Sequence, residues 1–197
     1  MTLVTQATER PSFEALFTPL LSPAYGAALR MVHNRADAED LVQEAALQAF
    51  RAYHTFQTGT NFKAWFFRIL TNCFISRYRR TKKERGDVAL DDTPELYLFT
   101  KTAEAGMHGP GTNPAQALLS RLDEEQVATA LAALPGEYRA VATLYFIEDF
   151  SYEQIAEVVG CPIGTVRSRL HRARKMLQRA LWQVAVESGV LPRPEAS

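Results

Sequence analysis

Residues 151–177 read "SYEQIAEVVGCPIGTVRSRLHRARKML", which is the pattern of two short helices joined by a tight turn. Ser151 and Gln154 have the spacing of a capping box, so we expect a helix to begin at the next residue after the serine. Gly160 can adopt the left-handed conformation that ends a helix, and the proline two residues later stiffens the turn before a second helix begins at about Thr165. The stretch therefore predicts a helix-turn-helix.

The second helix of this motif has one apolar face and one basic face. Apolar residues recur at intervals of three and four, as Ile163, Val166, Leu170, Ala173, Leu177 and Leu181. Residues 161–177 hold five Arg or Lys and no acid, although the whole chain balances 22 basic against 22 acidic residues. A solvated amphipathic helix would account for neither the missing acids nor the turn spacing. A helix that enters the major groove accounts for both, since arginine can read guanine there. The predicted DNA-contacting residues are Thr165, Arg167, Ser168, His171, Arg172 and Lys175.

A second basic segment, residues 61–85, is rich in aromatic residues and has eight Lys or Arg against one acid. Two adjoining stripes on this predicted helix should be buried: Phe62, Phe66, Ile69 and Cys73, and beside them Phe67, Leu70 and Phe74. What remains is a cationic ridge with Thr71 and Asn72 among its few neutral polar groups.

The loop "FQTGTN", residues 56–61, precedes this helix and offers an aromatic ring, amides and hydroxyls. Such groups beside a basic helix are what capture of unstacked bases requires, with Phe56 as the stacking ring. The alternative places Phe56 in the core and makes the loop a spacer. The side chains that this loop offers are those of Phe56, Gln57, Thr58, Thr60 and Asn61.

The periodicity elsewhere is helical, so we predict an all-α fold of two small helical domains joined by a flexible linker. The linker is residues 86–113, because "AGMHGPGTNP" is a poor helix former. The predicted units are a first domain over 1–85, the linker, a second domain over 114–187 and a tail over 188–197.

Several helix boundaries are readable from the sequence. Ser12 can cap a first helix that Pro19 and Pro23 interrupt, and the next run ends at about His33. Asp37 is the expected N-cap of a helix that continues to about His54. The expected buried stripe of that helix is Leu41, Ala45, Leu47 and Phe50. In the second domain Asn113 and Pro114 should open one helix and Pro135 another.

Composition excludes several classes of protein. The N-terminus lacks the pattern of a signal peptide and no apolar run is long enough to span a bilayer, so we expect a cytoplasmic protein without membrane insertion. Cys73 and Cys161 lie far apart and the four histidines are scattered, so we expect no metal site, no cofactor and no disulfide. We expect both cysteines to be passive, that is, without a redox role. No pattern indicates a small-molecule substrate.

Four motifs together resemble a known family. In chain order they are "DAEDLVQEAALQAF", "FKAWFFRILTN" followed by "YRR", "LPGEYRAV" and "SYEQIAEVVGCPIGTVRSRLHRAR". They resemble the successive conserved regions of the sigma-70 type transcription initiation factors, specifically the extracytoplasmic-function group, over about residues 12–185. The run "FQTGTNFKAWFFRILTNCFISRYRR" looks closest to members held by redox-responsive, zinc-containing anti-sigma proteins.

The resemblance implies a non-enzymatic function with three macromolecular partners: core RNA polymerase, promoter DNA and an anti-sigma factor, which we expect between the two domains. The helix over 37–50 would dock on the clamp helices of the largest polymerase subunits through Asp37, Asp40, Gln43 and Glu44. The loop 56–61 with Asn72 would read the melted −10 element, with Arg77, Arg79 and Arg80 to hold the DNA backbone. The helix from Thr165 would read the −35 element. Many members carry an acid where this chain has Ser76.

Two other classes remain to be distinguished. A two-domain helix-turn-helix regulator would share residues 151–179 but would not need a second cationic, aromatic helix. A metal-dependent nuclease could use Asp37, Asp40 and Glu44, yet these lie on one helix without a partner carboxylate or histidine at a recognisable spacing.

Overall fold

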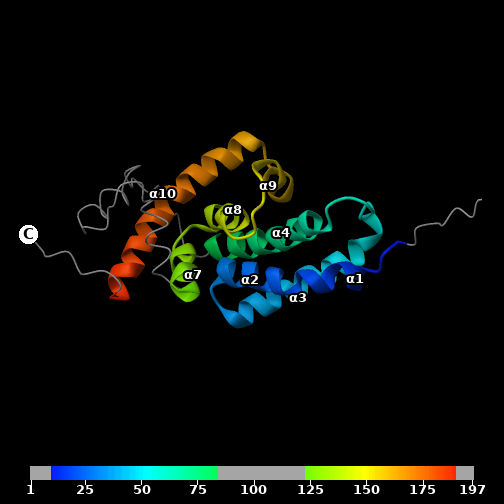
Figure 1. The fold of residues 1–197 in the computed structure, drawn as a ribbon, viewed down its shortest axis with the longest axis horizontal. Coiled ribbons are helices and arrows are strands. Elements are labelled where there is room, and N and C mark those ends of the chain that lie inside the picture. Colours follow the sequence, from blue (N-terminus) through cyan, green and yellow to red (C-terminus); the bar gives the residue numbers. More distant parts are fainter. Residues whose placement is uncertain (1–9, 84–122, 190–197) are drawn as a thin grey trace, which may run out of the picture.

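The computed structural model describes residues 10–83 and 123–189, and within these ranges every regular element is a helix (Figure 1). The elements are α1 Phe13–Phe17, the 3-10 turn η1 Thr18–Leu20, α2 Leu21–Val32, α3 Arg35–Ala52, the 3-10 turn η2 Tyr53–Thr55, α4 Phe62–Lys83, α7 Glu124–Ala132, α8 Gly136–Phe146, α9 Tyr152–Val159 and α10 Ile163–Glu187. The all-α prediction is confirmed. The proposed linker 86–113, Asn113, Pro114 and most of the tail lie outside the described residues.

Helix ends in the first domain mostly follow their sequence signals. The Ser12 hydroxyl accepts a hydrogen bond from the Ala15 amide at 3.2 Å, and the chain passes through η1 at Pro19 before α2 begins. The left-handed His33 ends α2. The prediction that Asp37 caps α3 is wrong, because the Asn34 side chain accepts the Asp37 amide at 3.1 Å and the helix starts at Arg35.

The predicted buried stripe of α3 is only half right. Leu41 and Ala45 are buried, but Leu47 and Phe50 are 51% and 56% exposed. The true buried face contains Ala38, Leu41, Val42, Ala45 and Ala49. At 100° per residue Leu47 points about 160° away from Ala45, so these two cannot share a face. Alanines along the buried face let α3 approach α2 and α4 closely.

Both predicted stripes of α4 face the interior. Phe66, Phe67 and Leu70 are fully buried, and Ile69 is half-buried. Thr71 is also fully buried, so the expectation that it lies on the exposed ridge is wrong. It occupies the position four residues after Phe67 and therefore shares the face of that ring.

The helix-turn-helix forms as predicted. Ser151 and Gln154 make the reciprocal hydrogen bonds of a capping box, and Gly160 is left-handed with φ of 67°. Pro162 is the N-cap of α10, which begins at Ile163, two residues before the predicted start. Of the predicted core positions on α10, only Ile163 and Leu177 are half-buried rather than buried.

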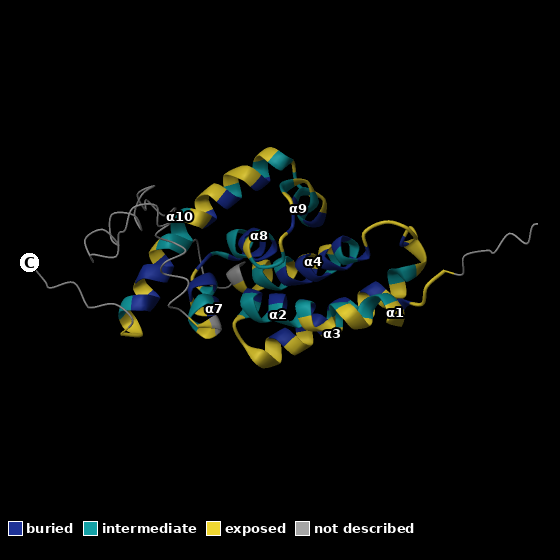
Figure 2. Ribbon diagram, in the orientation of Figure 1, coloured by how far each residue is buried: buried dark blue, intermediate teal, exposed yellow. Residues whose placement is uncertain are grey.

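The two domains pack directly on each other (Figure 1). Helices α8 and α9 lie against α4, and α7 and α8 lie against α2. Helix α8 is at the centre, and Ala140 through Leu144 are all buried (Figure 2). Among the described helices, none is long and apolar enough to cross a membrane.

Candidate nucleic-acid and protein interfaces

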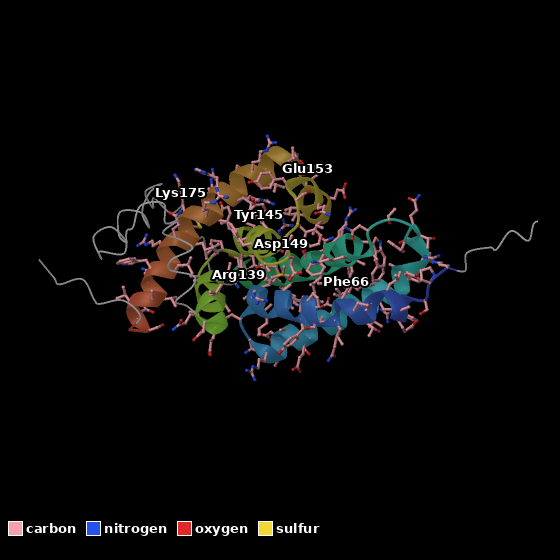
Figure 3. All side chains as sticks on the ribbon, viewed as in Figure 1. Phe66, Arg139, Tyr145, Asp149, Glu153 and Lys175 are labelled. Atoms are coloured by element: carbon pink, nitrogen blue, oxygen red, sulfur yellow. The ribbon has the colours of Figure 1, made fainter. Side chains whose placement is uncertain are left out.

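The outer face of α10 carries the predicted DNA-contacting residues. Arg167, Ser168, His171 and Arg172 are exposed, whereas Thr165 and Lys175 are half-buried. Lys175 lies on the outer side of α10 (Figure 3). At 100° per residue, Ser168, His171 and Lys175 form the middle of this face, and Arg167 and Arg172 flank it on opposite sides. The structure therefore brings these six residues onto one surface of one helix.

Neighbouring groups fix the arginines around this face. The Arg172 guanidinium donates to the Tyr138 hydroxyl at 3.4 Å, and Arg169 pairs with Glu137 at 3.2 Å. Hydrogen bonds from its own backbone amide and from the Ser151 hydroxyl lower the pKa of Glu153, and the charge of Arg167 lowers it further. Glu153 lies at the start of α9 (Figure 3).

A second polar surface runs along α4. Asn61, Arg68, Asn72 and Arg79 are exposed, and their spacings of seven, four and seven place them in one line. Within the described residues, the side chains of Arg68, Asn72 and Arg79 form no hydrogen bond or ion pair. Sequence reasoning missed Arg68, although its position four residues before Asn72 could have indicated it.

Arg77 does not lie on this line. Its guanidinium pairs with the Glu44 carboxylate at 2.5 Å and donates to the Asp40 carbonyl at 3.2 Å. Groups of α3 thus engage the donors of Arg77 in this structure, and its role in holding DNA stays a prediction. Arg79 and Arg80 remain exposed as predicted.

The loop before α4 rests on an aromatic cluster. Phe56 is only 5% exposed, and its ring centroid lies 5.2 Å from Phe62, 5.4 Å from Trp65 and 6.0 Å from Tyr53. The expectation that Phe56 offers an exposed stacking ring is wrong, and the alternative that placed Phe56 in the core is correct. By helical spacing the half-buried Trp65 lies beside the polar line on α4.

Two of the loop side chains serve local structure. The Asn61 carbonyl oxygen accepts the Ala64 amide at 3.0 Å and so caps α4, and the Thr60 hydroxyl donates to the Gln57 carbonyl at 2.7 Å. Gln57 and Thr58 are exposed. Among the predicted loop residues, these two retain side chains that form no hydrogen bond in the described structure.

The N-terminal segment ties down the base of this loop. The Arg10 guanidinium donates to the carbonyls of Tyr53 and Phe56, the latter at 3.0 Å, and lies 4.4 Å from the centre of the Tyr53 ring. The Tyr53 hydroxyl in turn donates to the Pro11 carbonyl. Residues more than forty positions apart in sequence therefore hold one another.

The outer face of α3 combines acidic and apolar groups. Asp40, Gln43, Leu47 and Phe50 follow one another at intervals of three and four, and all four are exposed. Glu44 lies beside this face but is engaged with Arg77 and Gln48. Asp37 is exposed in the first turn. The apolar pair Leu47 and Phe50 belongs to this surface, and sequence reasoning assigned it to the core.

Arg139, from the motif "LPGEYRAV", is held in the centre of the molecule (Figure 3). Its guanidinium donates to the carbonyls of Ala132, Leu134 and Met31. Burial lowers the pKa of this guanidinium, and the nearby Tyr78 partly offsets that effect. The group remains charged, because the ordinary pKa of arginine is far above neutral.

The two cysteines lie in different parts of the fold and form no disulfide. Cys73 is buried, and burial followed by the charge of Glu44 raises the pKa of its thiol, which Arg77 partly opposes. Cys161 is half-buried in the turn between α9 and α10, with its sulfur 3.9 Å from the Arg169 guanidinium. Within residues 10–83 and 123–189, no three His, Cys, Asp or Glu side chains are grouped so that they could hold a metal ion.

Comparisons with known proteins agree with this geometry. The fold defines a two-domain helical protein with a helix-turn-helix in its second domain. Sigma-70 region 2 matches residues 16–84, and Sigma-70, region 4 matches residues 116–177. The chain belongs to the sigma-70 family of RNA polymerase sigma factors, in the extracytoplasmic-function (ECF) group.

Three relatives illustrate the similarity. The chain is 36% identical over 168 residues to the ECF RNA polymerase sigma factor SigE of Mycolicibacterium smegmatis, a match that covers 85% of this chain and 61% of that protein. It is 34% identical to EcfG of Rhodopseudomonas palustris, covering 79% and 77%, and 31% identical to SigW of Bacillus subtilis, covering 80% and 82%. The match thus spans less than two thirds of the mycobacterial relative.

Solved structures show the same fold. The sigma factor RpoE from Bartonella quintana, in complex with the anti-sigma factor NepR, superposes with a TM-score of 0.62 and 28% identity, covering 86% of this chain and 96% of that one. CnrH, in complex with the cytosolic domain of CnrY, has a TM-score of 0.55 at 23% identity, covering 87% and 88%.

Proposed function

We propose that this chain is a transcription initiation factor that binds core RNA polymerase and directs it to promoters through their −10 and −35 elements. It acts in the cytoplasm and catalyses no reaction of its own. The observation that carries the proposal is the presence of two separate exposed polar surfaces, on α10 and on α4, in one chain. A helix-turn-helix regulator needs only the first, so the match to region 2 disfavours that alternative.

Run-off transcription with purified core polymerase on a library of genomic promoter fragments tests the proposal. Transcripts should require both the core enzyme and this protein, and their start sites should share upstream sequence elements. Binding to DNA without any transcript in the presence of core polymerase would instead favour the regulator.

We assign the −35 element to the outer face of α10, where Arg167 lies exposed at one edge. Replacing Arg167 with alanine should weaken binding to a cognate −35 duplex by about 1 to 3 kcal/mol and relax the preference at one base pair, because a bidentate contact to guanine is lost. Competition binding with a randomised −35 library measures both effects. Arg169 is a matched control, since its pairing with Glu137 directs it away from this face. An unchanged sequence preference would contradict the assignment.

We assign the −10 element to the line Asn61, Arg68, Asn72 and Arg79, together with Gln57 and Thr58 in the loop that precedes α4. Asn72 carries a hydrogen-bond donor and an acceptor, so it can pair with the edge of an extruded base. Trp65 takes the stacking role first expected of Phe56, because it is half-buried and belongs to the cluster beside this line.

Replacing Asn72 with alanine should leave folding and −35 binding nearly unchanged but lower transcription from duplex promoters by roughly tenfold or more, because unpairing costs a few kcal/mol and a base-specific pocket offsets part of it. Templates already mismatched across the −10 region should largely restore activity. The matched control is Ser76→Ala, one turn further along the exposed side of α4. Equal activity of Asn72→Ala and wild type on the duplex, at saturating core enzyme, would rule the assignment out.

We also propose that an anti-sigma factor controls the chain, and that this partner is of the redox-responsive, zinc-containing kind. The resemblance of residues 56–80 supports the subtype, and the burial of Cys73 agrees with placing redox chemistry in the partner. The direct contact of α8 and α9 with α4 occupies the place between the domains where we expected this partner. The partner would therefore bind the outer surface of the two packed domains, or it would displace one domain from its contact with the other.

A further inference from the structure

The start of α8 holds one edge of α10. Glu137 and Tyr138 are adjacent residues in the first turn of α8, and α8 packs against α10 (Figure 1). The Glu137 carboxylate pairs with Arg169 at 3.2 Å, and the Tyr138 hydroxyl accepts a hydrogen bond from Nη1 of Arg172 at 3.4 Å. The two arginines are three residues apart, so they are neighbours on one edge of α10. The first turn of α8 therefore contacts both arginines of this edge.

The two arginines are held in different ways. The Arg169 side chain is 23% exposed, and besides its charged partner its guanidinium lies 3.9 Å from the Cys161 sulfur. Arg172 is exposed, and within residues 10–83 and 123–189 its hydrogen-bond partner is the neutral Tyr138 hydroxyl. A neutral acceptor restrains a guanidinium without cancelling its charge. The positive charge of Arg172 therefore stays available to DNA.

The contact between Tyr138 and Arg172 is weak but well anchored. Its length of 3.4 Å exceeds the range of about 2.7 to 3.2 Å that is usual for N–H···O bonds. A carboxylate in the same place would hold the guanidinium roughly twice as strongly and would compete with a base for it. The Tyr138 ring is half-buried and packs against the core, so its hydroxyl is a fixed point. Tyr138 thus limits the motion of Arg172 without withdrawing it from the outer face of α10.

The donors of Arg172 allow this bond and a base contact at the same time. A guanidinium has five N–H donors in one plane, and the bond to Tyr138 uses one donor on Nη1. Nε and Nη2 remain, and their N–H bonds lie parallel along the other edge of the plane. Guanine presents two acceptors, O6 and N7, that accept such a parallel pair of donors in the major groove. The hydroxyl therefore restrains the plane and leaves a complete pair of donors free.

We propose that Tyr138 is a positioning residue for DNA reading, which holds the Arg172 guanidinium so that its free edge faces a guanine of the −35 element. In this arrangement α8 contributes to base preference although Tyr138 contacts no base. The restraint acts before binding and reduces the side-chain entropy that Arg172 loses on the DNA. This inference rests on the −35 assignment proposed above.

Tyr138→Phe tests the proposal, because it keeps the packed ring and removes the hydroxyl. Competition binding of the full-length protein is measured on −35 duplexes that carry each of the four base pairs in turn. At the position where Arg172→Lys loses the preference for guanine, Tyr138→Phe should lower that preference about three- to fivefold, as expected for one weak hydrogen bond. Other positions and the salt dependence should stay unchanged, because no charge is removed.

Tyr145→Phe is the matched control. It removes a hydroxyl from the opposite end of α8, where the Tyr145 ring lies against Phe146 and Tyr152. The base preference at the Arg172 position should be the same as in wild type. An equal loss of guanine preference in Tyr138→Phe and Tyr145→Phe would indicate a general effect on α8 and would overturn the inference.

A double-mutant cycle separates orientation from charge. Arg172→Lys keeps the positive charge but has no planar pair of donors to orient. Adding Tyr138→Phe to Arg172→Lys should therefore change the base preference no further. The same loss in both backgrounds would show that the hydroxyl acts independently of Arg172, and this result would overturn the inference.

The free protein gives a readout that needs no DNA. Nuclear magnetic relaxation of the Nε–H groups should show less motion for Arg172 than for the exposed Arg68, which has no hydrogen bond within the described residues. Tyr138→Phe should raise the motion of Arg172 to that of Arg68 and leave that of Arg169 unchanged. Unchanged motion of Arg172 would overturn the restraint.

The outcomes on DNA distinguish this inference from the assignment on which it rests. A wild-type protein without preference at any position of the duplex would overturn the −35 assignment and the inference with it. A guanine preference that neither Arg172→Lys nor Tyr138→Phe lowers would overturn the inference alone, and so would a preference that Arg172→Lys loses and Tyr138→Phe retains.

Discussion

Replacing Arg139 with alanine is expected to lower the free energy of unfolding by about 3 to 5 kcal/mol, a large part of the 5 to 15 kcal/mol typical of a folded protein. The guanidinium donates to carbonyls at the end of α7 and at the end of α2, and these part-buried acceptors would lose that donor. Its removal would also leave a cavity beneath α8. Urea unfolding followed by circular dichroism measures the loss.

Arg169→Ala is the control for this prediction. Arg169 is also a helical arginine of the second domain, but its partner Glu137 is 45% exposed, so the loss should stay below about 1 kcal/mol. If Arg139→Ala cost no more than the control, the carbonyls around it would be satisfied in another way, and its proposed structural role would be refuted.

Leu47→Asp is expected to weaken binding to core polymerase by about 100-fold, while the free protein keeps its stability. Leu47 is 51% exposed beside Phe50, so a carboxylate there is solvated in the free protein. At an interface it would be desolvated, and substitutions at such apolar anchors typically cost 2 kcal/mol or more. Fluorescence anisotropy of labelled protein, titrated with core enzyme, gives the dissociation constant.

Thr18→Asp on η1 provides the comparison for Leu47→Asp. Position 18 is exposed and lies outside α3, so the same added charge should leave the dissociation constant nearly unchanged. A similar loss for both variants would indicate a general effect of charge. No loss for Leu47→Asp would remove the outer face of α3 from the docking surface.

Local signals in the sequence were sufficient for most of the fold. The capping box at Ser151, the left-handed Gly160 and the stripes of α4 all depend on neighbours within one or two turns. Each of these features follows from helical periodicity or capping chemistry, which act over a few residues. The assignment of nucleic-acid surfaces to α4 and α10 rests instead on the resemblance of the motifs and stays a prediction.

What the sequence could not supply depends on long-range packing. Leu47 and Phe50 are apolar, and periodicity alone cannot tell a core position from an exposed docking position when alanines form the true buried face. Phe56 was assigned to base stacking because its aromatic partners were not visible from the sequence. Arg77 pairs with Glu44, which lies 33 residues earlier on another helix, and no local pattern indicates this contact. The direct contact between the domains is likewise a long-range feature.

The hydrogen bonds that link Arg10 and Pro11 to the base of the loop determine when the residues next to the loop lose their conformational freedom. A loop that is mobile before binding loses conformational entropy when it captures a base, at about 1 to 2 kcal/mol for each backbone residue that becomes fixed. Here the chain before α1 fixes the residues that flank the loop during folding, long before DNA arrives. Residues near the start of the described chain thus prearrange the proposed −10 surface, which is encoded some fifty residues later, and under that proposal the surface would lose less conformational entropy on binding a melted strand.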